Sequence, residues 1–244
     1  MMDQTEQVQT FFNRPQFYLD KNVGLVIRAQ VIRELVKDVP HSKILDIGCG
    51  DGSLSLQFQD LAHQITLVDF AVNMLNLAKS KVPKHLVDRI TFIQSDFFNY
   101  SAEDDFEVVF CIGVLAHVSS LHAAIKKISS YMNGGNYCIL QFTDQGQLIS
   151  RLTLLYYKFL HLLNIKSLYP LTLIRHEEIK EIVEQHDLDI IQKKCYWTTP
   201  PGVSRLPSSI SIKILTWMNK HRSIAQHGGE KMVLLIKHES AAHR

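Results

Sequence analysis

A short apolar stretch that turns on three closely spaced glycines constrains this 244-residue chain most strongly. The segment reads KILDIGCGDG from Lys43 to Gly52 and continues into Ser53–Phe58, which can open a helix. A strand, a glycine loop and a helix in this order bring backbone N–H groups and a helix N-terminus against a polar ligand. Asp46 lies two residues before the first glycine, where its carboxylate would repel a pyrophosphate and favour a cationic group. We therefore expect a ligand site at this loop.

The glycine spacing narrows the choice of ligand. The dinucleotide fingerprint G-x-G-x-x-G would put its third glycine at position 53, but that residue is Ser53 and the glycine is Gly52. The pattern D-x-G-x-G-x-G instead resembles motif I of the class I S-adenosylmethionine (SAM) methyltransferases of the small-molecule type. The resemblance implies SAM as the cofactor, S-adenosylhomocysteine as its product, and contacts from Asp46, Gly48, Cys49, Gly50 and Gly52.

A second carboxylate, Asp69, ends the apolar run 64–69, about twenty residues after the loop. An acidic residue in this position can accept hydrogen bonds from both ribose hydroxyls of an adenosyl ligand. SAM and NAD share that ribose, so Asp69 does not choose between them. It could instead cap the helix that starts near Ala71, and both roles could hold together. Phe70 and Met74 join the cofactor-binding set that the resemblance implies.

Two later strand ends also match the family. Residues 89–94 are followed by Asp96 and Phe97, which resemble the family's adenine-binding acid and its packing neighbour. Residues 106–112 are followed by 113–118, which resembles the segment that lines the cleft beside the sulfonium methyl. Ile112 and Gly113 are thereby assigned to the cofactor. No Asn/Asp-Pro-Pro-aromatic motif and no catalytic Pro-Cys follows, which disfavours a nucleic-acid base as the methyl acceptor.

The apolar runs alternate with helical patterns along the chain. This order predicts an α/β fold, a doubly wound and mainly parallel sheet, with ligands at the carboxyl ends of its strands. The resemblance implies seven strands, the last of them antiparallel. Residues 1–40 would form an N-terminal arm and helix that cover the cofactor cleft. Residues 41–244 would form the methyltransferase core, with insertions at about 144–175 and 198–230.

The arm and its helix offer two cofactor ligands. In the family an aromatic residue and an arginine from this region commonly cover the amino-acid end of SAM. Tyr18 and Arg28 occupy that part of the sequence. The alternative is that Tyr18 only packs and that Arg28 is a solvated charge on the helix.

The segment 147–174 combines helical apolar spacing with basic residues. Leu148, Leu152, Leu155 and Phe159 recur on one side, and there is no acidic residue between Asp144 and Glu177. The apolar run is too short to span a membrane, which takes ~20 apolar residues. The segment is expected to be a lid over an apolar substrate pocket, or else an interfacial helix resting on a membrane or a partner.

The resemblance implies methyl transfer by in-line displacement at sulfur, which asks the protein to align the acceptor and exclude water. The acceptor would be an oxygen or nitrogen of a small, partly lipophilic molecule, such as a natural product, sugar or quinone-like metabolite. Catalytic candidates are His117, His176 and Tyr18, with His117 alternatively a structural part of the cleft wall. Residues expected to contact the acceptor are His117, Tyr156, Tyr157 and Trp197.

Composition limits the remaining choices. A net charge of +2 gives no reason to expect a nucleic-acid partner. The four cysteines form no C-x-x-C pair, so no metal site is expected. The polar N-terminus lacks a signal sequence, and a cytoplasmic location is expected. Two alternatives to a SAM-dependent methyltransferase stay open. One is a non-catalytic SAM-binding scaffold that assists a partner enzyme, and the other is a nicotinamide oxidoreductase. The oligomeric state is also left open.

Overall fold

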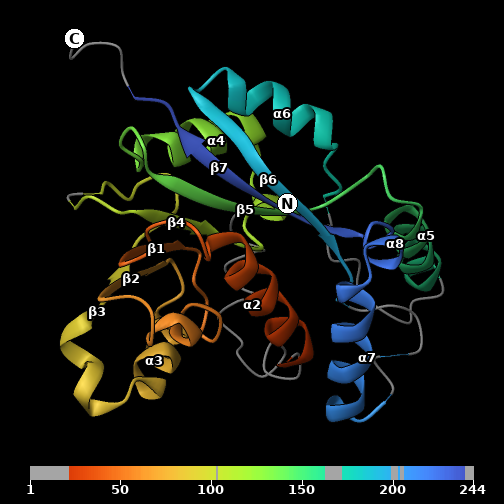
Figure 1. The fold of residues 1–244 in the computed structure, drawn as a ribbon, viewed down its shortest axis with the longest axis horizontal. Helices are drawn as coiled ribbons and strands as arrows, with labels where there is room; N and C mark the ends of the chain where they lie inside the picture. The colour runs from red at the N-terminus through yellow and green to blue at the C-terminus, as the bar shows by residue number, and fades with distance from the viewer. Residues whose placement is uncertain (1–21, 103, 163–171, 199–202, 204–205, 240–244) are drawn as a thin grey trace.

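The structure is a computed structural model that describes residues 22–102, 104–162, 172–198, 203 and 206–239. These residues form one seven-stranded sheet with helices on both faces (Figure 1). The strand order is β3-β2-β1-β4-β5-β7-β6. The strands are β1 Lys43–Ile47, β2 Gln64–Asp69, β3 Ile90–Gln94, β4 Val108–Cys111, β5 Tyr137–Thr143, β6 Leu188–Tyr196 and β7 Glu230–Lys237.

The pairing of the strands confirms the predicted fold class. β1 to β5 pair in parallel, and β7 is antiparallel to both β5 and β6. The strand order reverses between β1 and β4, the point at which ligands bind in open α/β sheets. The carboxyl ends of β1, β2 and β4 therefore meet at one edge, which we call the rim.

Helices pack on the two faces of the sheet. One face carries α2 Asn22–Val36, α3 Val72–Lys81 and α7 Ser208–Lys220, which we call the α2 face. The other carries α4 Leu121–Ser130 and α6 His176–Glu184, which we call the α4 face. Because successive side chains of a strand alternate, Ile44 packs on the α2 face and Leu45 on the α4 face. Asp46 then returns to the α2 face, where a carboxylate interrupts an otherwise apolar strand.

The segment after the glycine loop differs from the predicted helix. It forms only a four-residue 3₁₀ helix, η2 Ser55–Phe58. The Asp51 carboxylate accepts hydrogen bonds from the Ser53 backbone N–H (3.1 Å) and hydroxyl (2.9 Å), while the Ser55 hydroxyl bonds Asp46. Such side-chain hydrogen bonds compete with a regular helical turn. Further 3₁₀ segments in the described part of the chain include η3 Lys84–Arg89 and η4 Leu115–His117.

Both predicted insertions contain helices. α5 Leu148–Leu162 follows β5, and α7 with α8 Arg222–Ala225 lies between β6 and β7. The Gln147 amide donates to the Gln226 carbonyl (3.1 Å), and the Ser150 hydroxyl donates to the Gly229 carbonyl (3.2 Å). These bonds hold the start of α5 against the chain that enters β7. Among the described residues, no helix is both long and apolar enough to cross a bilayer.

Candidate functional site

The glycine loop lies at the rim between β1 and β2. The Gly48 and Cys49 N–H groups donate to the Val68 carbonyl of β2 at 2.8 and 3.0 Å. Gly48, Gly50 and Gly52 all have positive φ, which L-residues rarely adopt. A Cβ at Gly50 would meet nothing within 4 Å, so this part of the loop faces open space. The loop therefore leaves room for a ligand against its backbone.

Asp69 holds the loop and keeps capacity for a ligand. Its carboxylate accepts the Gly50 N–H and the Ala71 N–H, each at 2.8 Å. Burial raises the pKa of Asp69, and these backbone donors partly oppose that rise. An ionised carboxylate offers about four acceptor sites. The Phe70 N–H is a third backbone donor to this carboxylate, and the remaining acceptor capacity suits a ribose hydroxyl. The Ala71 bond shows that Asp69 also supports the start of α3.

Asp46 lines a cavity on the α2 face beside the loop. Burial raises the pKa of Asp46 to about 7, and the neighbouring Asp69 charge adds to the rise. The Ser55 hydroxyl donates to the Asp46 carboxylate and acts in the opposite direction. A cation placed in this cavity would favour the ionised form of Asp46. The cavity is lined by Leu25, Arg28, Asp46, Gly48, Cys49, Asp51, Leu54 and Ile112.

Arg28 brings a positive charge from α2 to the same cavity. The guanidinium lies near enough to Tyr196 and Glu230 to favour the ionised form of each, against the burial that raises both pKa values. Arg28 therefore interacts with the sheet beneath α2 and is not a solvated helix charge. The other predicted ligand of this region, Tyr18, lies outside the described residues.

Lys81, at the end of α3, binds residues of the glycine loop although it does not belong to the glycine motif. Its ammonium pairs with the Asp51 carboxylate, and it donates to the Ser53 hydroxyl at 2.6 Å and the Asp51 carbonyl at 3.2 Å. Asp51 is 4% exposed, so the pair is partly shielded from water. Sequence reasoning missed Lys81 because thirty residues separate the two partners and no motif links them.

The end of β3 places the predicted adenine residues at the next position along the rim. The Asp96 carboxylate accepts the Phe98 N–H at 2.8 Å, and the Phe97 carbonyl accepts the Tyr131 hydroxyl at 2.7 Å. The Phe97 ring packs edge-on against Phe98 and Tyr131. Much of Phe97 is thus used in packing.

Two other predicted cofactor residues flank Asp69. Met74 of α3 is fully buried, and Phe70 is half-buried directly after β2.

The predicted cofactor residues Ile112 and Gly113 lie directly after β4. Ile112 lines the cavity, and the exposed Gly113 follows with a φ of 78°. The structure thus brings Ile112 together with Asp46 and the glycine loop.

The two predicted catalytic histidines lie in different surroundings. His117 ends η4, in the segment that follows β4 at the rim, and burial lowers its pKa so that the neutral ring is favoured at pH 7. His176 begins α6 on the α4 face and stacks on Phe142 with ring centroids 6.4 Å apart. Burial and the nearby Lys231 charge lower the pKa of His176. The structure therefore separates His176 from the cavity on the α2 face.

The predicted acceptor-binding aromatic residues are spread out. Tyr156 is exposed on α5, and the Tyr157 side chain lies outside what the structure describes. Trp197 is half-buried after β6; its backbone N–H donates to Asn219 Oδ1 (2.8 Å) and its indole N–H to the Ile224 carbonyl (2.9 Å). With both donors used within the fold, Trp197 ties β6 to α7 and α8.

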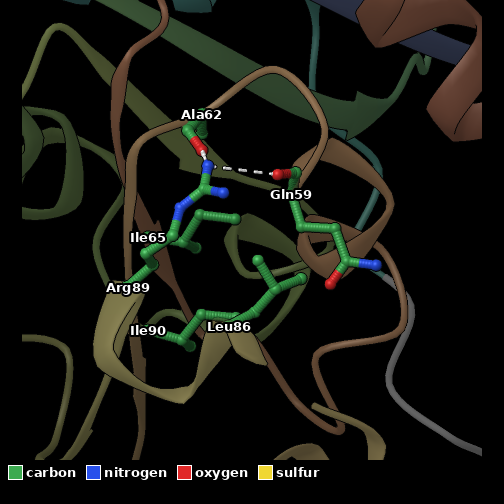
Figure 2. Close-up of a pocket in the computed structure, with 6 residues that line it drawn as sticks. All are labelled: Gln59, Ala62, Ile65, Leu86, Arg89 and Ile90. Atoms are coloured by element: carbon green, nitrogen blue, oxygen red, sulfur yellow. Dashed lines mark hydrogen bonds between the residues drawn. The ribbon is translucent and has the colours of Figure 1, made fainter. Parts of the chain in front are cut away.

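A second depression lies at the opposite, amino edge of the sheet (Figure 2). The Arg89 guanidinium donates to the Ala62 carbonyl and, at 3.3 Å, to the Gln59 carbonyl. Apolar atoms of Ile65, Leu86 and Ile90 complete the wall. Arg89 therefore caps the carbonyl groups that follow η2, and the chemistry of a ligand site is found at the rim and not here.

The residues at the rim fit an S-adenosyl ligand. The space before Gly50, the remaining acceptor capacity of Asp69 and the presence of Asp46 and Arg28 in one cavity suit a nucleoside sugar beside an ammonium and a carboxylate. Within the described part of the chain, no group of three His, Cys, Asp or Glu side chains could hold a metal ion.

Known methyltransferases are similar to part of this chain. Ubiquinone biosynthesis O-methyltransferase of Hydrogenovibrio crunogenus is 28% identical over 113 residues, which cover 42% of this chain and 44% of the relative. Malonyl-[acyl-carrier protein] O-methyltransferase of Bacillus cytotoxicus is 28% identical over 149 residues, which cover 57% and 50%. The matched region thus spans about half the length of these relatives.

Solved structures share the fold over nearly the whole chain. Magnesium protoporphyrin IX methyltransferase of Synechocystis PCC 6803 with bound S-adenosylhomocysteine has a TM-score of 0.67 at 18% identity, covering 96% of this chain and all of the other. A family model described as a methyltransferase domain matches residues 38–195, which include the glycine loop, Asp69 and His117. The chain therefore belongs to the methyltransferase domain family, the SAM-dependent class I enzymes whose glycine motif it carries.

Proposed function

We propose that this protein transfers the methyl group of SAM to an oxygen atom of a small, partly lipophilic molecule. The observation that carries the proposal is the convergence of Gly50, Asp69, Asp46 and Arg28 on one edge of a parallel sheet. Oxygen is favoured over nitrogen because the matched relatives are named as O-methyltransferases, one of them in ubiquinone biosynthesis.

The proposal gives each rim residue a role toward the cofactor. Asp69 would accept the ribose hydroxyls, Arg28 would bind the carboxylate, and Asp46 would face the cationic part of the amino-acid group. Asp96 would accept the adenine amine, beside Phe97. When bound, SAM supplies a methyl group already activated by its sulfonium. The residues of the protein therefore have to orient the acceptor and exclude water.

His117 is our candidate for taking the proton of an acceptor hydroxyl. It lies in the segment after β4, and burial keeps its ring in the neutral form that can accept a proton. A general base of this kind contributes ~10²–10⁴ in rate. We assign His176 a packing role instead, because it stacks on Phe142 on the other face of the sheet.

α5 would cover a lipophilic acceptor. Five of its apolar side chains lie on one stripe and are each more than half exposed: Leu148, Leu152, Leu155, Phe159 and Leu162. Its first turn is held at the rim by the bonds of Gln147 and Ser150. A helix anchored at one end beside the site can close over an apolar molecule and bury this stripe.

Incubation of the protein with methyl-labelled SAM and separate organic-solvent and aqueous extracts of its source cells tests the proposal. We expect labelled product in the organic fraction, with inhibition by S-adenosylhomocysteine. An Asp60→Asn variant, which alters only a surface ion pair with Arg33, should transfer label normally. SAM binding without label transfer to either extract would contradict the proposed function and favour the scaffold alternative.

A further inference from the structure

Polar side chains replace apolar ones where β5 ends and β7 begins, on the α2 face. Gln141 and Thr143 belong to β5, and Glu230 is the first residue of β7. Thr143 pairs directly with Glu230 across the antiparallel ladder, and Gln141 pairs with Met232 of the α2-face core. Directly paired residues lie on the same face, so these three polar side chains form one group at the rim.

Glu230 is the centre of this group. Its two carboxylate oxygens accept the Gln141 amide N–H and, at 3.3 Å, the Thr143 hydroxyl. Burial raises the pKa of Glu230, while the Arg28 charge and these two donors favour its ionised form. An ionised carboxylate can only accept, so the Gln141 amide must turn its NH₂ group toward Glu230. Its oxygen is then forced to point the other way.

The Gln141 oxygen has no hydrogen-bond partner in the structure, although the residue is 4% exposed. It lies toward Gly113: a Cβ built on that glycine would be 3.9 Å from it. Gly113 is exposed, has a φ of 78° and, as a glycine, places no side chain of its own between the oxygen and this part of the rim. Buried polar atoms nearly always have a partner, and one that lacks it within the protein calls for a partner from outside.

The position of Gln141 along the rim indicates which molecule supplies that partner. The glycine loop and Asp69 belong to β1 and β2, whereas β5 lies on the far side of β4. A nucleoside held at the loop leaves the β4–β5 part of the rim for the second substrate. An amide oxygen accepts hydrogen bonds only, so the group it binds must be an O–H or N–H donor.

We propose that Gln141 binds the methyl acceptor through a hydroxyl or amino group, and that Glu230 acts as a positioning residue that fixes the Gln141 amide. This inference rests on the proposed function, because it requires an acceptor at the rim. It adds the requirement that the acceptor, although partly lipophilic, carries a hydrogen-bond donor near its reacting atom.

Three variants test the assignment. Gln141→Leu removes the accepting oxygen. The exchange Gln141→Glu with Glu230→Gln keeps a hydrogen bond between the two positions, a carboxylate near Arg28 and an oxygen directed toward Gly113. Gln64→Leu is the matched control, since Gln64 is exposed at the amino end of β2, the edge opposite the rim.

Label transfer from methyl-labelled SAM is measured against a dilution series of the organic-solvent extract, well below each variant's Tm. The SAM Kd and the Tm are measured separately. We expect Gln141→Leu to raise the apparent KM for the extract about tenfold or more, with its SAM Kd within about twofold of wild type. The Tm of Gln141→Leu should fall because Glu230 loses a donor, and the exchange variant should recover both KM and Tm.

The outcomes separate this inference from the proposed function. An unchanged KM in Gln141→Leu, with normal transfer by the wild type, would overturn the role of Gln141 and leave the methyltransferase proposal standing; a water molecule would then be the partner of the oxygen. A loss of Tm without a change in KM would reduce Gln141 to a structural residue. Failure of the wild-type protein to transfer label would overturn both.

Discussion

The ligand specificity of the rim depends on individual carboxylates, and substitution of Asp69 tests this dependence most directly. Asp69 accepts backbone N–H groups of Gly50, Phe70 and Ala71, so replacing it with alanine would also loosen the loop. We expect Asp69→Asn, which keeps the shape but removes the charge, to weaken SAM binding about tenfold or more in calorimetry. Asp69→Ala should weaken it further while the fold persists by circular dichroism. Unchanged affinity in both variants would refute the ribose assignment.

Asp46 links stability to pH. Its pKa is about 7 in the folded protein, above the ordinary value of 3.8. The folded state therefore holds a proton that the unfolded state has released, and stability decreases as pH rises from about 4 to about 7. The slope contributed by this one group is at most ~1.4 kcal/mol for each pH unit in that window.

The variant Asp46→Asn checks this expectation, because asparagine still accepts the Ser55 hydroxyl but does not titrate. Thermal unfolding of wild type and variant is compared between pH 5 and 8. We expect the variant to gain stability over the wild type as the pH rises. Parallel pH profiles of the two proteins would show that Asp46 is not the buried acid described.

At the scale of the element, the glycine loop has two kinds of glycine. A Cβ at Gly48 would lie 2.5 Å from Val114 Cγ2, whereas a Cβ at Gly50 would meet open space. Both residues have positive φ, so alanine costs ~1–2 kcal/mol at either position. We expect Gly48→Ala to lose more stability, through the added overlap. Gly50→Ala should instead lose SAM affinity, because its methyl group projects into the ligand space.

Urea unfolding and SAM titration of both variants separate these effects. The double variant Gly48→Ala with Val114→Ala removes the overlap but keeps the strained φ, and it should recover part of the lost stability. Equal losses of stability in the two single variants, with SAM affinity unaffected in Gly50→Ala, would contradict this description of the loop.

α5 supplies the second element-scale prediction. If it closes over an apolar acceptor, Leu155→Lys should reduce label transfer to the organic-solvent extract severalfold and leave SAM affinity unchanged. The reason is that a charge on the stripe resists burial. Val87→Lys, an exposed position in η3 far from the rim, is the control. Normal transfer with reduced pelleting on anionic vesicles would favour the interfacial alternative for this helix.

At the scale of the molecule, local patterns predicted most of the architecture. Most strands were visible as apolar runs, and the order of strands and helices predicted the doubly wound sheet. The antiparallel last strand was predicted from the family resemblance. Local sequence patterns did not predict the side-chain contacts between residues that are far apart in the sequence. The Lys81–Asp51 pair and the Gln141–Glu230 bond join residues 30 and 89 positions apart, and Lys81, Gln141 and Glu230 belong to no motif. The short η2 was missed because side-chain bonds outcompete the helix there.

The same limit applies to the candidate site. Glycines and acids at strand ends could be predicted because the chain direction alone places them at one edge. The roles of Trp197 and His176 depend on which face they occupy and which donors they use, and these follow only from the packed structure. Arg28 was predicted for the cofactor, but its closeness to Glu230 was not.

We propose above all that the rim binds a sulfonium nucleoside at a loop whose third glycine is Gly52. Parallel calorimetric titrations of the wild-type protein with SAM and with NADH test it most directly. We expect SAM to bind to about one site per chain and NADH to give no binding heat. Binding of NADH with no response to SAM would contradict it.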